Sequence, residues 1–126
     1  MLHVEAFDHI VLNVGDVARS LSWYRDVLGL DGVRVAEWEA GDAPFPSVRV
    51  NESTIIDLIE GERSGENLNH FCMVVSAEDL ATVRESGAFE IERDNPGQRL
   101  YGARGLADGI YIKDPDGNLL ELRAYN

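Results

Sequence analysis

An internal repeat constrains the fold of this chain more than any other feature of its sequence. Residues 8–14 read Asp-His-Ile-Val-Leu-Asn-Val, and residues 69–75 read Asn-His-Phe-Cys-Met-Val-Val. Each segment begins with a small polar residue and a histidine, His9 or His70, and continues with a mostly apolar run. The two histidines are 61 positions apart in a chain of 126 residues. Because half of such a chain is marginally stable alone, we expect two modules that pack as one unit.

A helix signature follows the histidine segment in both repeats. Asp16 is placed to cap a helix over residues 17–28, whose apolar side chains share one face before Gly29 ends it. Ser76 caps the second helix in the same way, with an aspartate in the capping-box position and Gly87 as the stop. The sequence therefore predicts one helix in each module.

Two strands joined by a turn close each repeat. In the first repeat the strands are residues 47–50 and 54–59, and in the second they are residues 109–113 and 118–125. The second turn, residues 114–117, reads Asp-Pro-Asp-Gly, with Pro and Gly where β-turns favour them.

The order of these elements predicts an α+β fold class with two βαβββ modules in a mixed sheet. The first module covers about residues 5–60 and the second about residues 68–126. Residues 61–67 are polar, contain Gly, and form the expected linker between them. We expect residues 1–126 to form a single domain.

The charge balance excludes two classes of partner. The chain has 11 Lys and Arg against 23 Asp and Glu, a net charge of −12, so we expect neither nucleic acid nor an anionic membrane to bind. No apolar run approaches the roughly 20 residues that a membrane helix needs, and the N-terminus lacks a signal-peptide pattern. The single cysteine, Cys72, lies among apolar residues, which suggests a core position in a reducing compartment. The expected location is the cytoplasm.

Four side chains of the kind that bind metals occupy matching places in the two repeats. His9 and His70 lie on the first strand of each module, and Asp57 and Glu121 lie on the last. Strand alternation directs each of them to a face that is otherwise mostly apolar. Taken singly, a strand histidine is more often a hydrogen-bonded structural residue, and a strand carboxylate more often faces solvent. Together, their repetition predicts a divalent metal site, because one cation satisfies all four groups.

The sequence resembles the vicinal oxygen chelate superfamily. The resemblance rests on the repeated histidine segments, on residues 102–105 (Gly-Ala-Arg-Gly), and on residues 111–122 (Tyr-Ile-Lys-Asp-Pro-Asp-Gly-Asn-Leu-Leu-Glu-Leu). It covers nearly the whole chain. This group contains glyoxalase I, extradiol dioxygenases, fosfomycin-resistance enzymes, methylmalonyl-CoA epimerase and bleomycin-resistance proteins. Its motifs are specific for a fold and much less so for a reaction.

The resemblance implies an open, cup-shaped sheet with flanking helices and a metal ion inside. It assigns His9, His70 and Glu121 as metal ligands, without distinguishing Fe, Mn, Ni, Zn and Co. Asp57 falls where glyoxalase-like members have a glutamate that is both a fourth ligand and a base. Aspartate is one methylene shorter, so this departure weakens the glyoxalase assignment. We expect Asp57 and Glu121 to be the catalytic carboxylates.

Three further residues are candidates for substrate binding. Arg104 lies in a Gly-rich loop and is suited either to an anionic substrate or to solvent. Arg123 follows Glu121 by two residues and is suited either to an anion or to an ion pair with Glu121 itself. Tyr101 is a candidate for the lining of the cup, although strand tyrosines usually pack.

The expected function is that of a metal-dependent enzyme acting on a small vicinal-dioxygen substrate, with glyoxalase-like lyase or isomerase chemistry. One alternative is a metal-independent binding or resistance module that sequesters a small molecule, although such binders need no metal ligands. A second is an extradiol-type dioxygenase, whose members usually have a longer, duplicated chain. By resemblance alone, we expect a homodimer.

Overall fold

The computed structural model describes the chain except at nine positions. The described residues are 1–62, 65, 67–94, 96–97, 100–113, 115 and 117–125. Within them the chain forms nine strands and three helices, and none of these helices is long and apolar enough to cross a membrane. The chain divides into two compact units, one of residues 9–69 and one of residues 1–8 with 70–126. The division falls inside the first strand, β1 (Ala6–Val14).

The unit of residues 9–69 forms a mixed four-stranded sheet. After β1 come α1 (Val17–Asp26), β2 (Asp31–Val33), α2 (Val35–Glu39), β3 (Ser47–Asn51) and β4 (Thr54–Glu60). The strand order is β2-β3-β4-β1, in which β1 and β4 are parallel and the other two pairs are antiparallel. The first and last strands of the module are therefore neighbours.

Helix α1 covers one face of this sheet. Its N-cap is Asp16, whose side chain accepts a hydrogen bond from the backbone N–H of Arg19 and so satisfies one of the free amides of the first turn. Leu21 of α1 packs with Val48 of β3 and Leu58 of β4 in a buried cluster. Because side chains alternate along a strand, Asp57 is directed to the opposite face.

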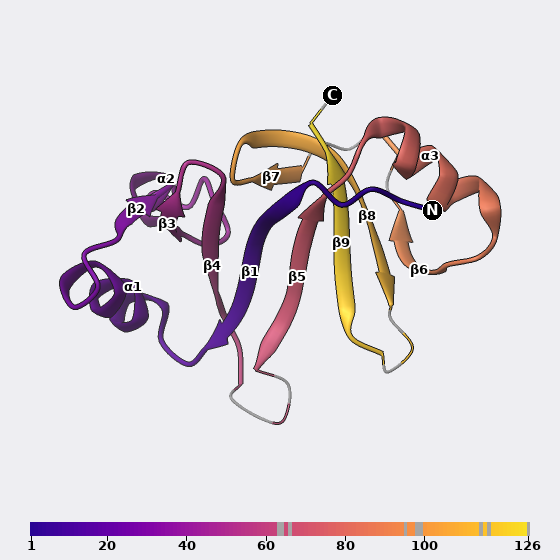
Figure 1. Ribbon diagram of the computed structural model, residues 1–126. Helices are drawn as coiled ribbons and strands as arrows, with labels where there is room; N and C mark the ends of the chain where they lie inside the picture. The colour runs from indigo at the N-terminus through magenta and orange to yellow at the C-terminus, as the bar shows by residue number, and fades with distance from the viewer. Residues whose placement is uncertain are drawn as a thin grey trace. The chain divides into compact units, whose positions relative to one another are not determined.

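The second unit repeats this arrangement. Its elements are β5 (Leu68–Val74), α3 (Ala77–Ser86), β6 (Glu90–Asp94), β7 (Leu100–Gly102), β8 (Gly105–Lys113) and β9 (Leu119–Ala124). The strand order is β5-β9-β8-β6, and the short β7 pairs with β8. Figure 1 shows β5, β9 and β8 side by side. As in the first unit, the first and last strands are parallel, and the remaining pairs are antiparallel.

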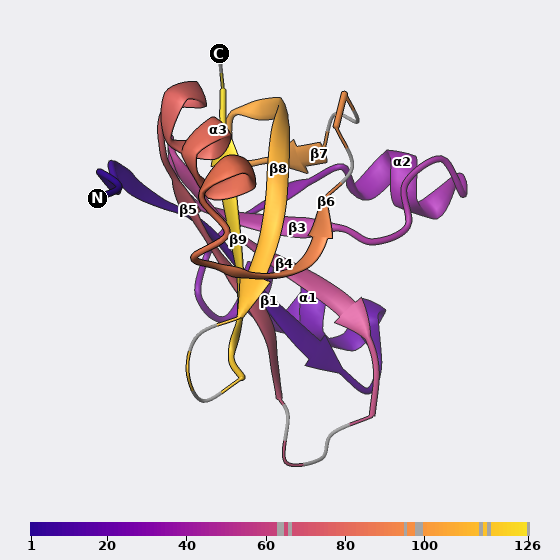
Figure 2. The same cartoon turned by 90° about the vertical axis from the view of Figure 1, so that its right-hand side faces the viewer.

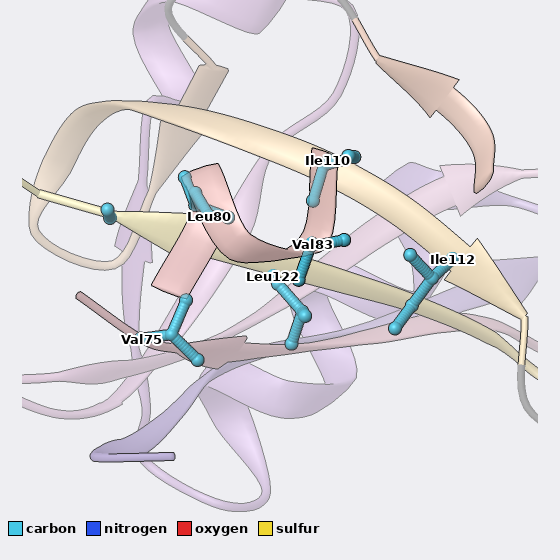
Figure 3. Close-up of a cluster of buried hydrophobic side chains, with 7 residues drawn as sticks. Val75, Leu80, Val83, Ile110, Ile112 and Leu122 are labelled. Carbon is cyan, nitrogen blue, oxygen red and sulfur yellow. The ribbon is translucent and has the colours of Figure 1, made fainter. Parts of the chain in front are cut away.

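Helix α3 covers one face of the second sheet (Figure 2). Ser76 caps it by accepting a hydrogen bond from the N–H of Asp79, and Gly87 ends it with a left-handed φ of 69°. The core between helix and sheet is a cluster of seven buried side chains, six of which are labelled in Figure 3: Val75, Leu80, Val83, Ile110, Ile112 and Leu122. Burial of these apolar side chains stabilises the unit and leaves the other face of β9 to Glu121 and Arg123.

The predicted fold class is confirmed, since each half is a βαβββ module with a mixed sheet. The caps at Asp16 and Ser76 are also confirmed. Helix α1 ends at Asp26 rather than at residue 28, and the short helix α2 was not expected. The predicted turn 114–117 lies partly outside the described residues, which omit Asp114 and Asp116, and the predicted linker 61–67 lies partly outside them as well.

Candidate metal-binding site

Strands β1 and β4 bring His9 and Asp57 together in the unit of residues 9–69. The two strands are parallel, with Val11 paired to Asp57, so alternation places His9, Val11 and Asp57 on one face. Nε2 of His9 lies 3.7 Å from Oδ2 of Asp57, and both side chains are buried. An imidazole and a carboxylate therefore lie side by side away from solvent.

Ser47 holds the other oxygen of Asp57. Strand β3 is antiparallel to β4 and places Ser47 directly opposite Asp57. The Ser47 hydroxyl donates a hydrogen bond of 2.5 Å to Oδ1, and both groups are buried. The carboxylate is thereby fixed with Oδ2 directed at His9.

Strands β5 and β9 bring His70 and Glu121 together in the second unit. These strands are parallel, with Cys72 paired to Glu121, so His70, Cys72 and Glu121 share one face. Nε2 of His70 lies 3.3 Å from Oε1 of Glu121, and both side chains are buried. This pair occupies the same place in its module as His9 and Asp57 occupy in theirs.

Arg123 fixes the second oxygen of Glu121. Nε of Arg123 donates a hydrogen bond of 2.9 Å to Oε2 of Glu121, and the Arg123 side chain is 0% exposed. Burial disfavours the charged guanidinium, but the Glu121 carboxylate favours it, so the pKa of Arg123 is raised. The Asp8 carboxylate lies 4.0 Å from Nη1 of Arg123, so this one cation faces two carboxylates. This buried cation therefore orients Glu121 with Oε1 toward His70.

The other nitrogens of Arg123 tie strand β9 to the β7–β8 hairpin. They donate to three backbone carbonyls of the hairpin, at 3.1 to 3.5 Å: those of Leu100, Tyr101 and Gly105. Gly102 makes this approach possible, because a Cβ at that position would lie 1.6 Å from Nη1 of Arg123. Arg123 thus connects Glu121 with the hairpin that carries Arg104.

The hydroxyl of Tyr125 completes the network around Arg123. It accepts hydrogen bonds of 3.1 Å from Nη1 of Arg123 and from the backbone N–H of Arg104, and it donates to Oδ2 of Asp8. Burial and the hydrogen bond to Asp8 raise the pKa of Tyr125 to about 12. The hydroxyl therefore stays protonated and keeps its place between Asp8 and Arg123.

Tyr111 lies against the second pair. Strand β8 places it opposite Glu121, and its ring meets the His70 ring edge-on, with centroids 5.2 Å apart. Burial raises the pKa of the Tyr111 hydroxyl, and the charge of Glu121 and a hydrogen bond to it raise the pKa further. Tyr111 stands in the place that Ser47 occupies in the first unit, so in both units a hydroxyl side chain faces the carboxylate from the neighbouring antiparallel strand.

The two pairs have the donor chemistry and the spacing of metal ligands. Protein nitrogen and oxygen ligands lie about 2.0–2.2 Å from a zinc-like ion, so neighbouring ligand atoms are about 3–3.5 Å apart. The His70–Glu121 separation of 3.3 Å lies in this range, and the His9–Asp57 separation of 3.7 Å is slightly longer. In each unit the far oxygen of the carboxylate is held by a neighbour, which is how metal-ligating carboxylates are usually oriented. The residues therefore fit a divalent ion.

The predicted substrate residues have unequal positions. Arg104 is exposed, and its guanidinium carbon lies 4.5 Å from the centre of the Tyr125 ring. Tyr101 is half-buried. Arg123 is fully buried and bonded to protein atoms, so we do not retain it as a substrate ligand; its position is that of the ion pair with Glu121, the other role considered above.

Two residues that support the pairs, Ser47 and Asp8, were not expected. Ser47 follows from the register of the β3–β4 hairpin, because pairing the predicted strand ends, residues 50 and 54, places Ser47 opposite Asp57. In the β8–β9 hairpin the predicted strand ends, residues 113 and 118, would place Tyr111 opposite Leu120, so its contact with Glu121 required the observed register. Asp8, by contrast, is directed to Arg123 from a distant part of the chain, and no local pattern signals that contact.

Comparison with known sequences gives a family and a relative. The model of the Glyoxalase/Bleomycin resistance protein/Dioxygenase superfamily matches residues 6–122. A probable lactoylglutathione lyase of Synechocystis sp. is 27% identical over 126 residues, which cover 90% of this chain and 91% of the relative.

Two solved structures share the fold. Methylmalonyl-CoA epimerase of Streptomyces coelicolor has a TM-score of 0.71 at 19% identity and covers 97% of this chain and 95% of its own. The Mn(II)-bound glyoxalase from Novosphingobium aromaticivorans has a TM-score of 0.67 at 17% identity, covering 98% of this chain but 40% of its own. At these identities both likenesses show the fold alone.

Proposed function

The chain belongs to the Glyoxalase/Bleomycin resistance protein/Dioxygenase superfamily, and on this premise we propose that it is a metal-dependent enzyme with lyase or isomerase chemistry. Its substrate is a small compound with two vicinal oxygens. The observation that carries the proposal is the recurrence of one buried histidine–carboxylate pair at the same place in both modules. A binding module with no metal has no need of these four costly buried polar groups.

His9, His70 and Glu121 are the proposed ligands of one divalent ion, and Asp57 is a fourth ligand or lies close to it. When bound, such an ion stabilises negative charge that develops on the substrate oxygens. Two hydrogen bonds within the chain hold the ligand atoms in place: Ser47 donates one to Asp57, and Arg123 donates the other to Glu121.

Asp57 is the proposed proton acceptor. Glu121 is bonded to the Arg123 guanidinium, which stabilises its ionised form and makes it a poorer base. Asp57 instead lies against the neutral hydroxyl of Ser47 and the imidazole of His9. A carboxylate in that setting accepts a proton from the carbon next to a polarised carbonyl more readily. Glu121 then acts as a ligand, and Asp57 moves the proton.

Metal content tests the proposal. Protein purified without chelator is loaded with Mn²⁺ and analysed for bound metal, together with the variants His70→Ala and His3→Ala. We expect about one ion per functional site in the wild type, at least a hundredfold weaker binding in His70→Ala, and no change in His3→Ala, because His3 is exposed and outside both pairs. Undiminished binding by His70→Ala contradicts the proposed site.

The two pairs belong to one site either within a chain or across the homodimer that the family resemblance implies. Mixing the inactive variants His9→Ala and His70→Ala distinguishes these arrangements. If sites form across a dimer, each mixed dimer regains one of its two sites, so random exchange between equal amounts of the variants restores about a quarter of the metal binding. If sites form within a chain, none returns. Light scattering of the wild type gives the oligomeric state in the same buffer. We also propose a cytoplasmic location, as the single buried cysteine, Cys72, suggests.

A further inference from the structure

Strand β6 contains a β-bulge that changes the face on which Arg93 lies. Ile91 pairs with Ile112 of β8, whereas Arg93 pairs with Tyr111, so Glu92 is an extra residue in the ladder. In a regular ladder with no bulge, Glu92 would pair with Tyr111 and Arg93 with Ile110, which belongs to the core beneath α3. The bulge instead places Arg93 on the face of the sheet that carries Tyr111. Bulges of this kind often re-aim a side chain beside a functional site.

Arg93 lies directly on the aromatic ring that contacts the His70–Glu121 pair. Its guanidinium carbon is 4.3 Å from the centre of the Tyr111 ring. The same ring meets His70 edge-on at 5.2 Å, and strand pairing places Tyr111 opposite Glu121. One buried tyrosine therefore joins an exposed cation to the proposed ligand pair.

Neighbouring charged side chains form ion pairs, whereas Arg93 forms none with the residues that the structure describes. Lys113 pairs with Glu92 at 3.3 Å, and Arg84 of α3 pairs with Asp94 at 2.9 Å. Among the residues that the structure describes, no carboxylate lies within 4.0 Å of the Arg93 guanidinium, and Arg93 is exposed. In a chain with 23 acidic and 11 basic residues, such an arginine beside a candidate site is suited to an anionic ligand.

We infer that Arg93 binds a carboxylate of the substrate, so the substrate class is that of vicinal-dioxygen compounds that also carry a carboxylate group. A guanidinium has five N–H donors in a planar fork that matches a carboxylate with two parallel hydrogen bonds. Stacking on the face of the Tyr111 ring leaves the N–H donors along the edge of this exposed guanidinium open to a ligand. Contact with Tyr111 fixes the guanidinium, which lowers the cost of ordering it on binding. This inference rests on the proposed function and names its substrate class.

Four chelating probes test the inference on the manganese-loaded protein by isothermal titration calorimetry. Acetohydroxamate is the probe without a carboxylate, and the monohydroxamates of malonic, succinic and glutaric acid carry one at increasing distance. We expect the best of the three acids to bind at least about tenfold more tightly than acetohydroxamate, the gain expected of a charge-assisted hydrogen bond. Arg93→Gln should reduce this ratio below about threefold, while the affinity for acetohydroxamate and for Mn²⁺ stays the same. Arg93→Lys keeps the charge without the fork and should retain part of the ratio.

Arg25→Gln is the matched control, because Arg25 is an exposed arginine of helix α1 in the other unit, and it should keep the full ratio. A wild-type ratio below threefold, or a ratio that survives in Arg93→Gln, overturns the inference. Manganese uptake is measured separately and tests only the proposed function, not the role of Arg93. If the protein takes up no manganese, the same ratio is measured on the metal-free protein, and failure of all the acids to bind there overturns the role of Arg93 as well.

Discussion

The Nε atom of Arg123 donates a 2.9 Å hydrogen bond to Oε2 of Glu121, two residues earlier on strand β9. Both side chains are buried, and the rest of the guanidinium bonds the β7–β8 hairpin and the Tyr125 hydroxyl. The first module has no counterpart, because Ile59 is the residue two positions after Asp57. The two carboxylates therefore differ in their support: a guanidinium holds Glu121, and a serine hydroxyl holds Asp57. This difference separates the roles proposed for them.

Replacement of Arg123 by methionine should destabilise the fold strongly. The variant leaves the carboxylates of Glu121 and Asp8 buried without their cation, and breaking a buried pair in this way costs about 3–5 kcal/mol. Urea denaturation measures the free energy of unfolding. The control is Arg84→Met, which breaks a partly exposed pair with Asp94 and should cost about 1 kcal/mol or less. Equal losses of unfolding free energy in the two variants would show that Arg123 does not stabilise the fold through a buried ion pair.

Replacement of Tyr125 by phenylalanine should change the stability of the protein in alkaline solution. The pKa of Tyr125 is raised from 10.0 to about 12 in the folded state, so the folded state favours the protonated hydroxyl. That stability is fully present below pH 10 and is lost as the pH rises from 10 to 12. The free energy of unfolding of Tyr125→Phe should therefore fall less steeply over this window than that of the wild type. Tyr24→Phe, on helix α1, is the control, and its free energy of unfolding should fall with pH as steeply as that of the wild type. If it falls as little as that of Tyr125→Phe, the loss of stability is not due to Tyr125.

The sequence predicted the two pairs of candidate ligands because their positions depend on local regularities. Alternation along a strand sets the face of His9 and of Asp57, and the repeat transfers the same argument to His70 and Glu121. The parallel pairing of first and last strands then brings each histidine beside its carboxylate. These features need only the order and period of the elements.

The supporting residues depend on details that a pattern of residues does not contain. The bulge at Glu92 shifts the register by one residue and moves Arg93 to the other face, although the sequence of β6 shows no Gly or Pro to signal it. Helix α2 follows Arg34, which has a left-handed φ of 56°, an uncommon conformation for a residue with a side chain. The burial of Arg123 depends on Asp8 and Gly102, both remote in sequence, so its role as an ion pair rather than a substrate ligand required the structure.

Replacement of Asp57 by asparagine should separate proton transfer from metal binding. The amide is able to accept the Ser47 hydrogen bond but not a proton, so kcat should fall by at least about a hundredfold while most bound Mn²⁺ remains. Asp57→Glu restores the longer carboxylate and should keep more activity than the amide. Asp31→Asn, at an exposed position on strand β2, is the control and should keep the wild-type rate. Equal rates in Asp57→Asn, Asp57→Glu and the wild type would make Asp57 a structural carboxylate only.

The expected reaction class depends on which nucleophiles and bases the described residues of the candidate site offer. Cys72 shares the face of His70 and Glu121, but it is 0% exposed, and burial and the charge of Glu121 raise its pKa well above its ordinary value, so it does not supply a thiolate. A bound ion that chelates two vicinal substrate oxygens would acidify the neighbouring C–H bond, and Asp57 is the proposed acceptor of that proton. We therefore expect turnover of a vicinal-dioxygen substrate under nitrogen, with solvent deuterium entering the product at that carbon.

An oxygen electrode and a panel of hydroxy ketones, 2-oxoaldehyde–thiol adducts and catechols provide the measurement. Stoichiometric oxygen uptake with a catechol would make the protein a dioxygenase, and tight binding of a small molecule by metal-free protein without turnover would make it a binding module.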